Sequence, residues 1–249
     1  MRIRTIGTMA IIGAAVLFRP FDAEACSCGG TIPTSIALRW ADAVFLGTVS
    51  RVERPQPISH VNTDGSVTVE INAQPTSTIF DPSRVFRGPA VPQVAVVGHN
   101  SSCDKSFEPG EVWLVYGHDA VGGIEIDPCS RTRLGSETAQ DLAYLEGIES
   151  GRQQGIVYGD VLRRKSSPAG KTGLYVLLEP VHVVAAMGSR RFVATSERWG
   201  PYQLVLPAGD FDIWVERNDT PVSTNVSVHV EHGADLRLQL VVEYPDNDR

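Results

Sequence analysis

The placement of the cysteines constrains the fold of this chain more than any other feature. All four cysteines lie in the first 129 of 249 residues, at Cys26, Cys28, Cys103 and Cys129. An even number of cysteines in an exported chain predicts a disulfide framework, here of two bridges. A bridge between Cys26 and Cys28 would be badly strained. Two connectivities remain open, and each would staple the first half of the chain with two long crosslinks.

Residues 1–25 have the organisation of a signal peptide. They contain a basic start, an apolar run over residues 9–18 and a small-x-small cleavage site that ends at Ala25. The apolar run is too short to span a bilayer. Cleavage after Ala25 would leave Cys26 as the first residue, with a free α-amino group. The sequence therefore predicts a secreted or periplasmic protein.

A cysteine at the first mature position also occurs in lipoproteins, so a lipid anchor on Cys26 is the alternative. A lipoprotein signal has a Leu-like residue three positions before the cysteine and small residues next to it. Here Ala23 and Glu24 occupy two of these positions, and the glutamate fits poorly. We expect a soluble product, with membrane contact only if Cys26 is lipidated.

Charge and motifs argue against several classes of function. The net charge of −7 becomes −8 after removal of the leader, and we expect no basic cluster. This charge argues against binding of nucleic acid or of an anionic membrane surface. The chain has no Gly-x-Ser-x-Gly, P-loop or Gly-x-Gly-x-x-Gly motif. We expect no enzymatic activity and no cofactor, and we interpret Asp210, Asp212, His229 and His232 as exposed polar residues.

Hydrophobic periodicity predicts a mainly β protein in two parts. The first part has expected helices at 34–41 and 136–148, and expected strands at 43–52, 66–72, 76–86, 94–98, 111–117 and 123–126. In the second helix, Ser136 is the expected cap, and Ala139, Leu142, Leu145 and Ile148 form the expected apolar face. A polar, glycine-rich segment at 147–155 predicts a domain boundary. The later expected strands, 155–162, 174–185, 191–195, 202–206, 210–216, 222–230 and 236–242, indicate a small β-sandwich.

The first half resembles the netrin-like module of tissue inhibitors of metalloproteinases. The matching pieces, in order, are the N-terminal CSC, ADAVFLGTV, VFRG, SSCDKSFEPGEVWLVYG, and DPCSRT before a final helix. The resemblance implies an OB-fold-like five-stranded barrel with flanking helices over residues 26–149. It also implies the disulfides Cys26–Cys103 and Cys28–Cys129.

The same resemblance implies a binding function. In inhibitory members, the amine nitrogen and carbonyl oxygen of the first cysteine bind the catalytic zinc of the target protease. Cys26 would be that residue here, Ser27 would enter the pocket beside the metal, and Ser101 and Ser102 would flank it. Catalytic zinc keeps an open coordination position that accepts such donors. The implied partner is a zinc metalloprotease. The alternative is a non-inhibitory structural or adhesive cell-surface module, in which the cysteines only staple the barrel.

The second half resembles the transthyretin-like, or carboxypeptidase-regulatory-like, β-sandwich domain. The matching pieces are GIVYGDV and TSERWGPYQLVLPAGDFDIWVE. This resemblance covers residues 150–249 and implies a structural module or a binding appendage without catalysis. The whole chain is thus predicted to be a barrel followed by a sandwich, with a protein as its partner.

Overall fold

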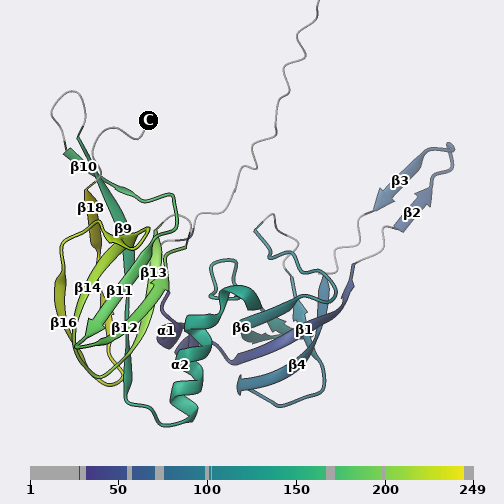
Figure 1. Cartoon of the computed structure of the whole chain (residues 1–249). Coiled ribbons are helices and arrows are strands. Elements are labelled where there is room, and N and C mark those ends of the chain that lie inside the picture. The colour runs from purple at the N-terminus through teal and green to yellow at the C-terminus, as the bar shows by residue number, and fades with distance from the viewer. Residues whose placement is uncertain are drawn as a thin grey trace, which may run out of the picture.

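The computed structural model describes most of the chain that follows the predicted leader. The described residues are 28, 32–54, 58–70, 76–98, 101, 103–166, 172–197 and 200–243. The predicted signal peptide and the two residues that follow it, Cys26 and Ser27, lie outside these ranges. Within them the fold is mainly β, as predicted, with a barrel in the first half and a sandwich in the second (Figure 1).

The barrel is a closed sheet of five strands. Its strands are β1 (Ala43–Glu53), β4 (Ser77–Arg87), β5 (Val94–Val97), β7 (Gly123–Glu125) and β6 (Val112–Ala120), in this spatial order. Pairing of β6 with β1 closes the sheet, and β5 and β7 are its one parallel pair in the described part of the chain. A short strand, β8 (Arg133–Leu134), adds to β6. The predicted OB-fold-like barrel is confirmed.

Adjacent residues of β1 are buried on opposite faces, which explains why helices must cover the barrel. Phe45 points into the barrel, where it meets Phe80 edge-to-face at 5.7 Å between ring centroids. Its neighbour Val44 lies in a second apolar cluster with Leu145 and Ala37, which come from the two α-helices. Successive strand residues face opposite sides, so burial of both requires a layer of helix outside the barrel wall.

Two short strands between β1 and β4 form a hairpin that projects from the barrel (Figure 1). They are β2 (Ile58–Val61) and β3 (Val67–Glu70). The turn has Gly65 at φ 81°, and the Asp64 carboxylate accepts hydrogen bonds from the amide and hydroxyl of Ser66. These hydrogen bonds lower the pKa of Asp64.

The two α-helices lie between the barrel and the sandwich (Figure 1). They are α1 (Thr34–Trp40) and α2 (Ala139–Glu149), and a 3₁₀ turn, η1 (Gly135–Glu137), precedes α2. The expected helix start at Ser136 is wrong, because the residue before α2 is Thr138, whose hydroxyl donates to the Gly135 carbonyl at 2.7 Å.

The expected apolar face of α2 is only partly correct. Leu145 is buried, but Ala139 and Ile148 are exposed. The helix instead buries Asp141 and Tyr144. A helix packed between two β structures has two buried sides, so a single apolar stripe does not describe it.

The sandwich consists of two five-stranded sheets. The first contains β9 (Gln154–Ser166), β10 (Thr172–Val176), β13 (Pro201–Pro207), β17 (Asp235–Arg237) and β18 (Leu240–Glu243); the second contains β11 (His182–Met187), β12 (Arg190–Thr195), β14 (Gly209–Arg217), β15 (Thr220–Pro221) and β16 (Val226–Val230). Two expected strands are each divided in two. The expected strand 174–185 is interrupted around Pro180, which has no amide hydrogen for a ladder. The expected strand 236–242 is divided between β17 and β18, and the expected strand 222–230 begins four residues too early, because β16 starts at Val226.

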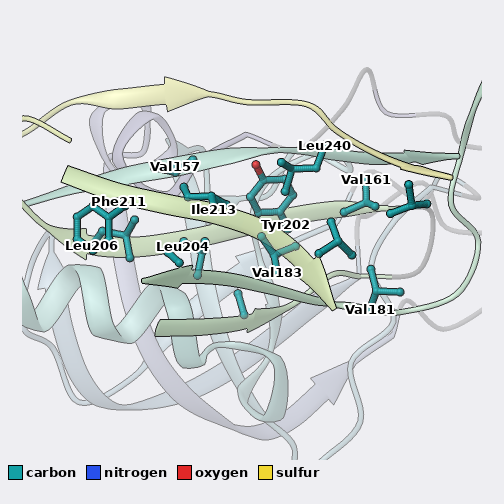
Figure 2. Packing of buried hydrophobic residues seen from close by; sticks show 14 of the residues in the cluster. Val157, Val161, Val181, Val183, Tyr202, Leu204, Leu206, Phe211, Ile213 and Leu240 are labelled. Atoms are coloured by element: carbon teal, nitrogen blue, oxygen red, sulfur yellow. The ribbon is translucent and has the colours of Figure 1, made fainter. Parts of the chain in front are cut away.

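The core of the sandwich lies between its two sheets (Figure 2). Leu204 and Tyr202 from β13 meet Ile213 and Phe211 from β14 in the same buried cluster. The Tyr202 hydroxyl donates to the Leu238 carbonyl at 2.7 Å, so the one polar atom of that side chain is satisfied. Burial raises the pKa of Tyr202 well above its ordinary value.

A four-residue connection, 150–153, joins α2 to β9. The Gln154 side chain, just beyond it, donates to the Tyr144 carbonyl at 2.7 Å. A Cβ atom at Gly147 would lie 2.1 Å from the Gln154 side-chain oxygen, so only glycine permits this approach. The Val205 amide in β13 donates to the Gln140 side chain at 3.2 Å. The two halves are therefore in direct contact, while the predicted boundary between residues 149 and 150 stays a prediction.

Candidate functional site at the cysteine edge of the barrel

Cys28 forms a disulfide with Cys129, with 5.4 Å between their Cα atoms. This bridge confirms one of the two pairings that the netrin-like resemblance implies. It attaches the chain just ahead of α1 to the loop that follows β7. The other implied pairing, Cys26–Cys103, involves Cys26, which lies outside the described residues, although Cys103 is itself disulfide-bonded.

A buried ion pair holds the same stretch of chain two residues beyond the bridge. Arg131 donates to the Ile32 carbonyl at 2.7 Å, and its guanidinium also donates to both carboxylate oxygens of Asp141. The side chains of Arg131 and Asp141 are only 2% and 1% exposed. A two-point contact between guanidinium and carboxylate fixes orientation as well as distance. Arg131 thereby links the Ile32 carbonyl, just ahead of α1, to α2.

Asp141 is the centre of a larger buried network. Besides Arg131, it accepts hydrogen bonds from the Tyr116 hydroxyl and the Thr34 hydroxyl, each at 3.0 Å. Burial, followed by the negative charge of Asp141, raises the pKa of Tyr116 well above its ordinary value. A buried carboxylate with this many donors has its hydrogen-bonding capacity satisfied. Such networks favour one packing arrangement of the surrounding side chains.

The sandwich contributes to this network through Gln203. Its side-chain oxygen accepts from the Thr34 amide at 2.9 Å, and its nitrogen donates to the Thr34 hydroxyl at 2.7 Å. Farther along α1, the Arg39 guanidinium lies 3.2 Å from the Asp235 carboxylate of β17. Helix α1, which begins shortly after Cys28, is thus anchored to both halves of the protein.

Of the predicted contact residues, Ser101 is the one whose placement is described. It is exposed, donates to the Asp104 carboxylate at 2.9 Å and accepts from the Cys103 amide at 3.1 Å. Cys26, Ser27 and Ser102 lie outside the described residues. Their predicted roles therefore stay predictions.

A cavity of about 240 Å³ opens beside Ser101 at one end of the barrel. Val96 and Phe107 are among the apolar residues that line it, and Arg54 and Lys105 are among the polar ones. Burial lowers the pKa of Lys105. Sequence reasoning missed both this cavity and the Arg131–Asp141–Gln203 network. The SSCDKS motif was a signal for the cavity, because it places a cation and three hydroxyls around one cysteine.

The acidic and histidine residues of the sandwich are placed as expected on the solvent side. His229 lies 2.7 Å from Asp210, with side chains 62% and 88% exposed. Asp212 accepts from the Ser227 hydroxyl at 2.6 Å on the same exposed surface. His232 is exposed as well, and its ring accepts a hydrogen bond from the Gln154 amide at 3.3 Å.

No protein-family model matches this chain, and no curated protein matches it either. Neither helix in the described ranges has the length and apolar composition needed to cross a membrane.

Proposed function

We propose that the protein is an exported inhibitor of a zinc metalloprotease. In this proposal the amine nitrogen and carbonyl oxygen of Cys26 bind the catalytic zinc of the protease, and Ser27 enters the adjacent pocket. Ser101 and Ser102 form the flanking edge. The inhibitor itself is not an enzyme and has no cofactor.

The observation that carries the proposal is the double anchoring of the chain around Cys28. The Cys28–Cys129 bridge holds Cys28, and the hydrogen bond from Arg131 holds the carbonyl of Ile32, four residues later. Cys26 is two residues from the bridged Cys28. A group that must chelate a metal benefits from a rigid support, because less conformational freedom is then lost on binding.

The chemistry of the terminus suits this role near neutral pH. An α-amine has an unperturbed pKa of about 7.7–8.0, so loss of its proton to a metal requires little free energy. Catalytic zinc sites have three protein ligands and an exchangeable water. Displacement of that water by the two Cys26 donors would leave the protease without its nucleophile.

The proposal is tested first by the intact mass and N-terminal sequence of the exported protein. We expect a chain that begins at Cys26 with an unmodified amine. A diacylglyceryl adduct would instead support the anchored structural or adhesive module, and a start at any other residue would also end the chelation proposal.

The second test is inhibition of a panel of zinc metalloproteases by the mature protein and by a variant with one glycine before Cys26. We expect the extension to abolish inhibition while the thermal unfolding temperature stays the same. A matched control has one glycine added after Arg249 and should inhibit like the wild type. Equal inhibition by both extended proteins, or no inhibition of any protease, would reject the mechanism.

A further inference from the structure

The hairpin of β9 and β10 is a second feature of the surface with chemistry of its own. Residues 162–166 pair with 172–176, and β10 is the terminal strand of its sheet. This hairpin lies at the end of the sandwich that points away from α2 (Figure 1). Three consecutive side chains of β10 are exposed, Leu174 at 53%, Tyr175 at 58% and Val176 at 42%.

This exposure breaks the usual pattern of a strand that covers a core. Such a strand buries every second residue, as β14 does with Phe211, Ile213 and Val215. In β10 consecutive apolar residues are exposed, so both faces of the hairpin present apolar surface to solvent. Contiguous exposed apolar surface on a soluble protein marks an interaction site more often than isolated residues do.

The same hairpin is basic, although the whole chain is acidic. Residues 161–178 contain Arg163, Arg164, Lys165 and Lys171 and no acidic residue, whereas the complete chain has a net charge of −7. Arg163, Arg164 and Lys165 are consecutive residues of β9, so the expectation of no basic cluster overlooked this local run.

The register places an arginine opposite two of the three exposed apolar residues, and Val176 is opposite Leu162. Leu174 is opposite Arg164, and Tyr175 is opposite Arg163. Residues directly opposite each other in an antiparallel pair share a face, so each face combines an apolar group with a guanidinium. Arg164 also lies 3.2 Å from Glu243, but both side chains are at least half exposed. A surface ion pair of this kind is weak, so Arg164 can release Glu243 and bind another anion instead.

We propose that this hairpin docks onto an anionic lipid surface. Leu174, Tyr175 and Val176 would enter the boundary between head groups and acyl chains, while Arg163 and Arg164 would bind lipid phosphates. Apolar residues combined with arginine or lysine are the composition that binds membrane interfaces, and tyrosine is enriched at that depth. The proposal is independent of the protease-inhibitor function and of lipidation, because it involves neither Cys26 nor the barrel.

The test is co-sedimentation of the mature chain with vesicles. The protein used is one in which mass spectrometry shows that Cys26 has no lipid modification. Vesicles of phosphatidylcholine alone are compared with vesicles that also contain phosphatidylglycerol. We expect binding to the second kind only, weakened by salt as screening predicts. Leu174→Ser with Tyr175→Ser should lower the partition coefficient about tenfold, and Arg164→Gln about fivefold.

Matched controls separate this surface from general effects of charge and polarity. Val121→Ser alters a fully exposed apolar residue in the β6–β7 turn, and Arg190→Gln removes an exposed charge from β12. Both should bind vesicles like the wild type, and all variants should keep the wild-type unfolding temperature. Absence of binding, equal binding to both kinds of vesicle, or unchanged binding by the Leu174 and Tyr175 variant would overturn the proposal. The proposal would also be overturned if the Leu174 and Tyr175 variant still bound vesicles like the wild type and lost only self-association or only binding to an acidic polysaccharide.

Discussion

Gln203 in the sandwich forms two hydrogen bonds with Thr34, 169 residues away at the start of α1. The side-chain oxygen accepts from the Thr34 amide, and the side-chain nitrogen donates to the Thr34 hydroxyl. Both residues are buried, at 4% and 0% exposed. The second half of the protein thus satisfies the first free amide of the helix that follows Cys28. Its role is structural support of the N-terminal edge, in addition to any binding of its own.

Replacement of Gln203 by alanine should destabilise the protein by about 2–3 kcal/mol. The variant leaves the Thr34 amide buried without its partner, and an unsatisfied buried polar group has a penalty of about this size. The free energy of unfolding, measured by urea denaturation, is the test. Gln93→Ala is the matched control, because Gln93 is exposed and bonds only to the Asp81 side chain among its described partners. A loss for Gln203→Ala no larger than that of the control would contradict the prediction.

Asp141→Asn should have a larger effect, about 3–5 kcal/mol. Asparagine keeps the shape of the side chain but removes the charge, so the buried guanidinium of Arg131 loses its counterion. Breaking a buried ion pair from one side has a penalty in this range. Urea denaturation again supplies the measurement, and Asp119→Asn on the exposed part of β6 is the control. If both variants unfold at the same denaturant concentration, the Asp141 network does not stabilise the fold.

Removal of the Cys28–Cys129 bridge should destabilise the protein by about 4–5 kcal/mol in the chain-entropy treatment. The bridge encloses 101 residues of sequence separation, so it restricts the unfolded chain strongly. The double variant Cys28→Ser, Cys129→Ser is compared with the wild type by thermal and urea unfolding.

Peptide mapping of the non-reduced wild type should yield Cys28–Cys129 and Cys26–Cys103. Any other pair of linked peptides would remove the family-like geometry on which the proposed chelation depends.

The sequence predicted the strands of the barrel well, because strands such as β1 and β6 are long and apolar. It did not predict the network around Asp141, since the partners Thr34 and Gln203 are distant in sequence and all three residue types are usually solvent-exposed. For the same reason the helical periodicity predicted that Ala139 and Ile148 are buried, and it gave no indication that Asp141 is buried. The burial of a polar residue depends on partners that only the tertiary structure brings together.

The strand divisions in the sandwich have a different cause. Pro180 is a signal for a break within 174–185, but the alternation of apolar and polar residues at the start of 236–242 contains no such signal. The chain nevertheless changes sheet between β10 and β11, and it pairs with two separate parts of β9 through β17 and β18. Which strand lies beside which is a property of the packed sheets. A single sequence read locally cannot supply it.

Stability should decrease as the pH rises above 10, the ordinary pKa of tyrosine, and Tyr116 should contribute to the decrease. Burial and the charge of Asp141 raise the pKa of Tyr116 in the folded protein well above that of the unfolded chain. Below pH 10 the phenol is protonated in both states, so no stability is lost there. Above it the unfolded state binds fewer protons than the folded state, and the free energy of unfolding falls with increasing pH.

Tyr116→Phe isolates this contribution. The variant cannot ionise, so its free energy of unfolding should fall less steeply between neutral pH and pH above 10 than that of the wild type. Its stability at neutral pH should be lower, because Asp141 loses one hydrogen-bond donor. Tyr144, whose pKa burial also raises, should maintain part of the slope in both proteins. The measurement is a series of urea denaturations over pH with tyrosinate absorbance recorded in parallel. Identical slopes for the two proteins would show that Tyr116 ionises in the folded state as readily as in the unfolded one, and the buried hydrogen bond to Asp141 would then be wrong.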